Sequence, residues 1–421
     1  MSTWPSRWFF KWVAALTVLA GGLRLFGLWS YLPTGDDYLV PITADFYTAT
    51  GQPYPTEPFH PVLRNLFASL SMSIFGRGAF GVKFFSLVLG ILLVVVVALF
   101  VRRAAQNERA GMLAGLFVAV DILLIDYSRQ ALQEVHVAFF AVLGAWLVAE
   151  ALALEETHAW RWLLPIAGLS FGLGVSSKLY AVMPLAVSLV VLTWVSVRRR
   201  RADEALTVAS SLVLLPSIVF LLTYAPWFGR GYDFAEWLTF QKATLEAMVT
   251  HSRPMIGFLA NSHPALWFIT PFYSFADYVD TATRSQLAVG LGNPLVWLAV
   301  LPAAAYSLAN PILRKQTALL QVYFWAAYLP LAMSPRPIWM LSAVSVAPFA
   351  FGLIAPALAD AWERREQGRA RTIVAVYLIL VMVTTALLYP LAIGRARDVR
   401  YLKPIVDRLG IEHVTTPAQG R

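Results

Sequence analysis

The chain has 421 residues, of which 58% are hydrophobic and only 14% are charged. Soluble globular proteins carry about 25% charged residues, so this composition excludes a soluble enzyme, a disordered tail and a nucleic-acid-binding domain. The net charge of +9 is typical of the short cytoplasmic loops of membrane proteins and does not by itself indicate a ligand. The absence of cysteine excludes disulfides, a Cys-ligated zinc site and a thiol nucleophile.

Apolar segments long enough to cross a bilayer recur along the chain. A spanning helix needs about 20 residues to cross roughly 30 Å of hydrocarbon. The first such stretch contains Arg24 and has no small-residue cleavage site, so we expect it to be retained as a span. The predicted spans are 8–29, 80–101, 111–126, 134–153, 162–177, 179–197, 206–227, 293–310, 316–333, 338–358 and 372–393. The sequence therefore predicts an all-α polytopic membrane protein with about 11 transmembrane helices.

Basic residues indicate which side of the membrane each loop faces. One alternate set of short loops holds sixteen of them, which marks that side as cytoplasmic: Arg7, Lys11, Arg102, Arg103, Arg109, Arg161, Arg198, Arg199, Arg200, Arg201, Arg314, Lys315, Arg364, Arg365, Arg369 and Arg371. The opposite side holds two long connections and a tail from about 394, and we expect the function there.

The two long connections do not divide the chain into separate domains. We interpret residues 1–421 as a single membrane domain, with a first outer catalytic loop at 30–79, a second outer loop at 228–292 and C-terminal transmembrane helices at 293–393. Residues 62–76 are too short and too rich in serine for a span, and favour a helix that lies in the membrane interface.

Polar residues cluster in the first outer loop. Asp36 and Asp37 directly follow the first span, and His60 and Arg64 follow in the same loop. Two adjacent carboxylates either mark the membrane boundary or provide a base whose pKa is raised by its neighbour. His60 precedes Pro61, so it serves either a turn or a site.

Three cations lie at the ends of separate spans on this same outer side. Arg129, Lys178 and Arg336 stand where positive charge is depleted, and a bound phosphate or diphosphate would explain them. Asp126 and Glu134 flank Arg129. The alternative is that Arg129 is an interfacial anchor with Glu134 as its partner.

The second outer loop is rich in aromatic residues, which are usually interfacial belt residues. We interpret most of its tryptophans in that way and give His263 a supporting role in a site. The sequence contains no phosphate-binding Gly-Lys-Ser/Thr loop, no His-Glu-x-x-His and no Gly-x-Ser-x-Gly. Polar residues are also sparse at the mid-span positions that a transporter needs for a midplane site, and no paired broken helices stand out.

The order of these short motifs resembles the protein O-mannosyltransferase family over nearly the whole chain. The segments that carry the resemblance are Asp36-Asp37, His60-Pro61-Val62-Leu63-Arg64, Ser128-Arg129 through Glu134, Phe171 through Tyr180, Ser262-His263-Pro264, Gly292-Asn293-Pro294 and Tyr328 through Arg336. Within them Asp37 stands for a Glu, Val62 for a Pro and Glu134 for an Asp. The second loop is also too short for the extra luminal domain of the eukaryotic enzymes.

The resemblance implies a C-type glycosyltransferase fold, shared with the aminoarabinose transferases, in which two long outer loops contain interfacial helices. It implies an inverting enzyme of the plasma membrane that moves a sugar, mannose by this resemblance, from a polyprenyl phosphate to a Ser or Thr hydroxyl of a protein. Asp36 would be the base with Asp37 beside it. Arg129, Lys178 and Arg336 would bind the donor phosphate, and His60, Arg64, Asp126, Glu134 and His263 would support the site.

Alternatives remain at this stage. The acceptor could instead be a lipid or a cell-wall glycan, and the chain could instead be a lipid-linked-sugar flippase or a noncatalytic scaffold. No cofactor or metal is required, because fixed cations can stabilise the leaving phosphate. The adjacent carboxylates leave a divalent cation as the alternative. The expected partners are the sugar donor, the acceptor and membrane lipids, without nucleic acid.

Overall fold

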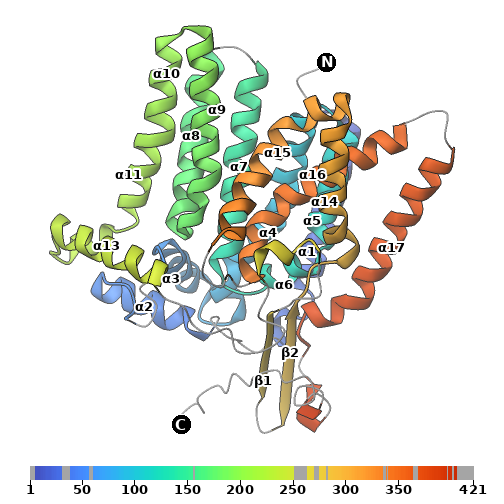
Figure 1. The fold of residues 1–421 in the computed structure, drawn as a ribbon. Helices are drawn as coiled ribbons and strands as arrows, with labels where there is room; N and C mark the ends of the chain where they lie inside the picture. Colours follow the sequence, from blue (N-terminus) through green and yellow to red (C-terminus); the bar gives the residue numbers. More distant parts are fainter. Residues whose placement is uncertain are drawn as a thin grey trace.

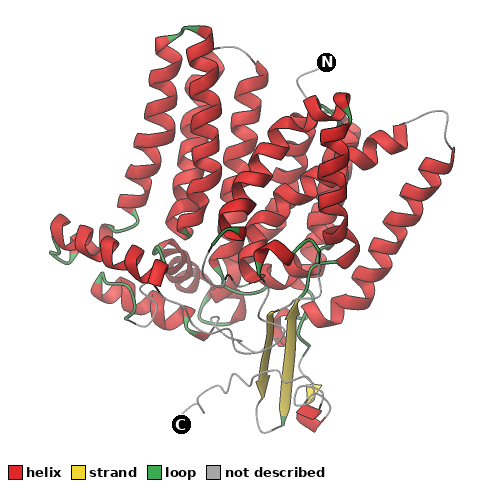
Figure 2. Ribbon diagram, in the orientation of Figure 1, coloured by secondary structure: helices red, strands yellow, loops and turns green. Residues whose placement is uncertain are grey.

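The computed structural model describes residues 5–30, 38–55, 60–154, 157–250, 263–269, 275–280, 283–334, 338, 340–363, 368–395, 397–400 and 403–404. Long helices run side by side along one direction (Figure 1) and dominate the described part of the chain (Figure 2).

A helix lies at each predicted span, although not every span is a single helix. The unbroken ones are α1 (Arg7–Leu25), α4 (Ala79–Ala105), α7 (Gln133–Leu154), α8 (Thr157–Ser177), α9 (Val182–Arg199), α14 (Pro294–Ala309), α15 (Pro311–Ala332), α16 (Ala343–Glu363) and α17 (Gly368–Ala392). Within the described residues, seven helices are long and apolar enough to cross a membrane, or eight with one bent pair. The predicted polytopic all-α membrane architecture is confirmed.

Two of the predicted spans are composite. The span at 111–126 consists of α5 (Glu108–Val120) and α6 (Ile122–Ser128), which are bent by 60°. The span at 206–227 consists of α10 (Ala202–Ala209), a π-helical turn η4 (Ser210–Leu214) and α11 (Leu215–Leu222). Residues 111–126 are therefore helical, as expected of a span, but the helix is bent at Asp121.

One end of the bundle carries short helices that cross its base, and we call it the loop-rich end (Figure 1). It contains η1 (Leu28–Ser30), α2 (Val40–Thr50), α3 (Leu63–Phe75), η3 (Leu179–Ala181), α12 (Ala225–Gly229), α13 (Phe234–Thr250), η5 (Pro264–Leu266) and η6 (Met340–Ser342). The predicted helix at 62–76 is α3, which ends at Gly76 with a φ of 77°. The opposite end, where α9 turns into α10 through Arg198–Arg201, is the arginine-rich end.

The second long connection also contains strands that the sequence did not predict. β1 (Phe275–Asp280) pairs antiparallel with β2 (Arg284–Gly290), so that Phe275 lies opposite Gly290. β2 then pairs with the two-residue β3 (Arg397–Asp398) near the end of the chain. This small sheet projects from the loop-rich end beside the base of α17 (Figure 1).

The core lies where α4, α5, α7 and α16 pack together. Of the 18-residue apolar segment of the span Met340–Glu363, which contains α16, 83% of the residues are buried, against 17% for α17. α17 stands at the edge of the bundle (Figure 1). Small residues bring the helices close: a Cβ added at Gly111 of α5 would lie 2.5 Å from the carbonyl oxygen of Ala98 in α4. Such close approach through small residues is the usual packing mode of membrane helices.

Candidate functional site

Asp121 organises the bend between α5 and α6. Its Oδ1 accepts a hydrogen bond from the backbone N–H of Leu124 at 3.1 Å, which caps the start of α6. Its Oδ2 accepts from the backbone N–H of Asn293 and from Trp297 Nε1, both at 2.9 Å. This fully buried carboxylate therefore joins the bend to the first turn of α14, because three donors converge on it.

The short helix α6 brings the predicted residues Asp126 and Arg129 to the loop-rich end. Asp126 is buried, and its Oδ1 accepts a hydrogen bond from Gln130 Nε2 at 3.1 Å. Arg129 is fully buried at the end of α6. The segment from Arg129 to Gln133 then leads into α7, which runs back through the bundle.

The guanidinium of Arg129 binds backbone carbonyls. Nη1 donates to the carbonyl oxygens of Arg24 at 2.7 Å and Phe26 at 2.8 Å, and Nη2 donates to that of Ile393 at 3.3 Å. These are the ends of α1 and α17. The donor-phosphate role of Arg129 stays a prediction, since the described contacts of these nitrogens are with the protein itself.

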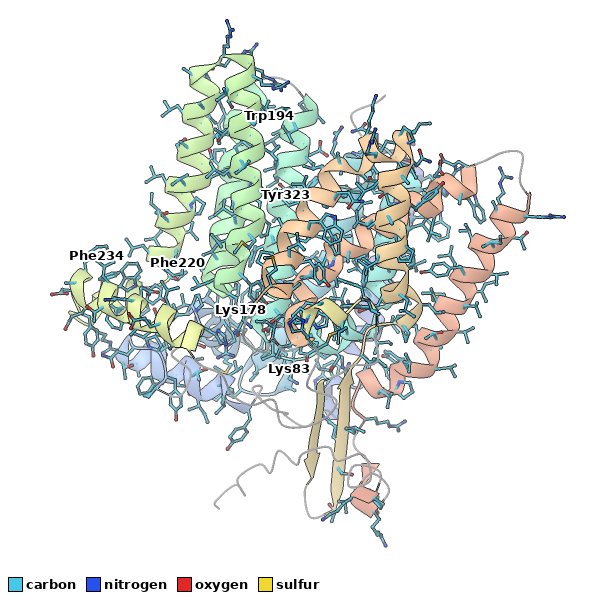
Figure 3. All side chains as sticks on the ribbon, viewed as in Figure 1. Lys83, Lys178, Trp194, Phe220, Phe234 and Tyr323 are labelled. Atoms are coloured by element: carbon cyan, nitrogen blue, oxygen red, sulfur yellow. The ribbon has the colours of Figure 1, made fainter. Side chains whose placement is uncertain are left out.

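Glu134 and Lys178 form a buried ion pair. Lys178 Nζ lies 2.5 Å from Glu134 Oε1, and the two residues are 7% and 2% exposed. The alternative interpretation made Glu134 the partner of Arg129, and the described partner of Glu134 is instead Lys178. The Lys178 ammonium also lies 5.3 Å from the centre of the Tyr180 ring. Figure 3 shows Lys178 and Lys83 near the loop-rich end, away from Tyr323 and Trp194.

A small pocket lies between α2, α3, α4 and α7. Arg64, Phe67, Ser86 and His136 are among the residues that line it. His136 Nε2 shares a hydrogen bond of 3.1 Å with Ser86 Oγ, and the ring stands edge-on to Phe67. The structure thus brings the predicted residues Arg64, Glu134 and Lys178 to the same end of the molecule.

Several of these side chains were absent from the predicted site. His136 lies two residues after Glu134 on α7, and Lys83 lies one turn before Ser86 on α4; both are buried. Ionisable residues inside apolar spans are costly and usually functional, so their position in the sequence was the available signal. We used Arg24 only to identify a retained span.

Two predicted supporting residues lie at the edge of this region. His60 is partly exposed. His263 is exposed, and its Nδ1 accepts a hydrogen bond from the backbone N–H of Ala265, which caps η5. Its described contact is therefore local, and its supporting role stays a prediction. Asp36, Asp37 and Arg336 lie outside the described residues.

In the described part of the chain, no group of three or more His, Asp or Glu side chains is placed to hold a metal ion. Asp36 and Asp37 lie outside the described residues. The predictions about metal dependence therefore stay predictions.

The sequence is similar to known protein mannosyltransferases. The family model "dolichyl-phosphate-mannose-protein mannosyltransferase" matches residues 64–241. A polyprenol-phosphate-mannose–protein mannosyltransferase of Mycobacterium tuberculosis is 25% identical over 408 residues, which cover 80% of this chain and 77% of that relative.

Solved structures share the architecture. The S. cerevisiae Pmt1–Pmt2 protein O-mannosyltransferase complex bound to the sugar donor superposes with a TM-score of 0.79 at 11% identity, covering 99% of this chain and 93% of that one. ArnT from Cupriavidus metallidurans bound to undecaprenyl phosphate gives a TM-score of 0.62 at 17% identity, covering 91% and 65%. The predicted C-type glycosyltransferase fold and the resemblance to the protein O-mannosyltransferase family are both confirmed.

Proposed function

We propose that this chain is an inverting glycosyltransferase of the plasma membrane. It moves a sugar, in our proposal mannose, from a polyprenyl phosphate to a Ser or Thr hydroxyl of a protein on the extracytoplasmic side. The observation that carries the proposal is the set of buried cations at the loop-rich end of a C-type glycosyltransferase fold: Arg64, Lys83, Arg129 and Lys178 are all less than 10% exposed. The relative from Mycobacterium tuberculosis bears the name of this activity.

The loop-rich end is extracytoplasmic in this proposal. Arg102, Arg103 and Arg198–Arg201 lie at the opposite end, and short loops rich in Arg and Lys face the cytoplasm. A polyprenyl phosphate keeps its tail among acyl chains and its phosphate at the interface. The buried cations of the loop-rich end lie where the helices reach that interface.

The cluster suits a monoanionic phosphate diester. Lys178 is paired with Glu134, and that carboxylate holds the ammonium in place while it offsets part of its charge. Arg64 and Lys83 supply further positive charge from α3 and α4. Fixed cations of this kind stabilise the charge that develops on the departing phosphate.

The reaction is a single displacement at the anomeric carbon. Asp36 accepts the proton of the acceptor hydroxyl, with Asp37 beside it. The hydroxyl oxygen forms a bond to the anomeric carbon while the bond from that carbon to the phosphate oxygen breaks. Polyprenyl phosphate leaves with the electron pair and is stabilised by Lys178 and Arg336. General base catalysis of this kind contributes about 10²–10⁴-fold in rate.

An Asp36→Asn variant tests this assignment. Purified protein is given a mannosyl polyprenyl phosphate and a Ser/Thr peptide, and peptide glycosylation and binding of the donor are both measured. Turnover should fall by about 10²–10⁴-fold with unchanged donor binding. Asp45→Asn is the matched control, because Asp45 is an exposed carboxylate of the same loop that pairs with Arg77. Full turnover in Asp36→Asn would contradict the role of Asp36, whereas the absence of turnover in the wild-type protein would favour a flippase or scaffold.

A second candidate keeps the donor and changes the acceptor to a lipid or a cell-wall glycan. It is supported by the fold shared with ArnT. Mass spectrometry of outer-face proteins and glycolipids, from cells with and without this chain, separates the two. Loss of hexose from Ser or Thr peptides supports the protein acceptor, and a change confined to lipids or glycans supports the second candidate.

We also propose that catalysis needs no metal or other cofactor, since fixed cations stabilise the leaving group. Turnover in EDTA should equal turnover in untreated buffer. Loss of turnover in EDTA that Mn²⁺ or Mg²⁺ restores would contradict this.

A further inference from the structure

Two buried arginines bind the ends of each other's helices. Arg24 of α1 reaches the end of α5 and the end of α6, while Arg129 at the end of α6 reaches the end of α1. We propose that Arg24 and Arg129 form a reciprocal arginine clasp that positions the start of the first outer loop. In this role both arginines are positioning residues for Asp36 and Asp37. The inference rests on the proposed transferase function.

Arg24 satisfies carbonyls that the bend leaves without helical partners. Its Nη2 donates to the carbonyl oxygen of Val118 at 3.1 Å, its Nη1 to that of Ala119 at 3.2 Å, and its Nε to Ser128 Oγ at 3.1 Å. The last four carbonyls of any α-helix lack intrahelical donors. A cation at this position also complements the negative end of the helix dipole.

The two other terminal carbonyls of α5 are satisfied as well. The carbonyl oxygen of Phe117 accepts from the N–H of Asp121 at 2.9 Å, and that of Val120 accepts from Thr385 Oγ1 of α17 at 3.0 Å. Each of the last four carbonyls of α5 therefore has a described donor, and Arg24 supplies two of them. Unsatisfied carbonyls in this dry environment would each cost about 1–3 kcal/mol.

Arg129 donates to carbonyl oxygens at the end of α1 in the same way that Arg24 does at the end of α5. It donates to the carbonyl oxygens of Arg24 and Phe26, and to that of Ile393 just after α17. The two preceding carbonyls of α1 also have donors. The carbonyl oxygen of Gly22 accepts from the N–H of Phe26, and that of Leu23 accepts from the Tyr389 hydroxyl. The end of α1 is therefore bound to both α6 and α17.

Gly90 of α4 makes room for the clasp. A Cβ added there would lie 2.2 Å from Ser128 Oγ and 3.4 Å from Arg24 Nε. Ser128 accepts from Arg24 and donates to the carbonyl oxygen of Leu124 at 2.5 Å, so its hydroxyl joins Arg24 to α6. Substitution of Gly90 therefore perturbs the clasp without any change of charge.

The position of the clasp along the chain connects it to the reaction. α1 ends at Leu25 and η1 at Ser30, and Asp36 lies six residues further on. Six residues reach at most about 20–22 Å, so the exit from α1 limits where the base can stand. A misplacement of about 1 Å can cost about 10²-fold in rate.

The test separates positioning by Arg129 from direct phosphate binding. The variants are Arg129→Lys, Arg24→Lys, Ser128→Ala and Gly90→Ala. Gly22→Ala of α1 is the control, because a Cβ there meets nothing within 4 Å. Peptide glycosylation and the Kd of polyprenyl phosphate are measured for each. A lysine keeps the charge but loses the forked donors that bridge two carbonyls.

We expect the rate to fall while binding persists. Turnover should drop by about 10²-fold in the two lysine variants and about tenfold in Gly90→Ala. The Kd of polyprenyl phosphate should stay within about threefold of wild type, a shift below 1 kcal/mol. A Kd raised tenfold or more in Arg129→Lys, with normal turnover in Ser128→Ala and Gly90→Ala, would overturn the proposal and make Arg129 a phosphate ligand.

A spectroscopic measurement reports the position directly and does not depend on activity. Because the chain has no cysteine, spin labels at Tyr38→Cys and Leu92→Cys measure the distance between the first outer loop and α4. In the Gly22→Ala background the distance distribution should match wild type. It should broaden or shift in the Gly90→Ala and Arg129→Lys backgrounds. An unchanged distance distribution in both the Gly90→Ala and the Arg129→Lys backgrounds would refute the positioning role of the two arginines. This readout does not depend on whether the transferase assignment holds.

Discussion

The two ends of the bundle hold their cations in different ways. At the arginine-rich end the described partners are carboxylates: Arg103 pairs with Glu150, and Arg199 and Arg201 lie 3.7 and 3.1 Å from Glu204. At the loop-rich end Lys178 also pairs with a carboxylate, Glu134, but Arg24 and Arg129 bind backbone carbonyls.

This difference matters for charge. A carboxylate cancels the charge of its partner, whereas carbonyl dipoles solvate a guanidinium without cancelling it. A cation that only binds helix ends can be replaced without loss of phosphate binding, whereas one that receives a phosphate cannot. The predictions below test this distinction.

The largest effect is expected for Lys178→Met. Removal of the ammonium leaves the Glu134 carboxylate buried without its described cation, which costs about 3–5 kcal/mol for a buried pair. The melting temperature in detergent should fall, and binding of polyprenyl phosphate should weaken at the same time. The double variant Lys178→Met/Glu134→Gln should recover most of the stability without recovering the binding. Recovery of both would make the pair purely structural.

Asp121→Asn should have the next largest effect. The carboxylate accepts from Leu124, Asn293 and Trp297, and an amide offers only one acceptor oxygen for these donors. Loss of hydrogen bonds to a charged group costs about 1.5–3 kcal/mol. Thermal unfolding measures the loss, and the α5–α6 bend should become variable. Equal stability of Asp121→Asn and wild type would show that the bend does not depend on this carboxylate.

Glu150→Gln tests the arginine-rich end. Loss of the Glu150 charge removes the ion pair with Arg103 and should lower the free energy of unfolding by about 1–2 kcal/mol. This lies between the values for exposed and buried ion pairs. Turnover per folded molecule and the Kd of polyprenyl phosphate should not change, because this pair lies at the far end of α4 and α7 from Lys178. Weakened donor binding here would mean that the two ends are not functionally distinct.

The smallest effect is expected for Arg77→Ala. Arg77 pairs with Asp45 at 2.6 Å, but their side chains are 66% and 46% exposed. Exposed ion pairs contribute little and are screened by salt. Melting temperature and turnover should both remain within error of wild type at 150 mM salt. A clear loss of turnover would show that α2 and the connection between α3 and α4 must stay joined through this pair during catalysis.

Much of the fold could be predicted from local patterns. A span of about 20 apolar residues is a local property, so a helix lies at each predicted position. The helix at 62–76 was predicted from its serine-rich, partly apolar pattern and is α3. The strands β1 and β2 were not predicted, since their pairing depends on a neighbouring segment and not on a period within the connection.

The candidate site could be predicted only in part. Sequence order placed Arg129, Glu134 and Lys178 at one end of the bundle, but it could not pair them. Lys178 reaches Glu134 across 44 residues, and Arg24 reaches Ser128 across 104. The roles of Asp36, Asp37 and Arg336 remain predictions, as those residues lie outside the described part of the chain.

By itself the sequence determined that this protein is a polytopic membrane protein and at which end of the helix bundle many of its polar residues gather, because apolar length and the positions of polar residues along the spans are local properties. Only the tertiary structure decided which partner each buried charge takes. That choice depends on where helices end and bend, since a broken helix such as α5–α6 exposes carbonyls that a distant arginine can bind.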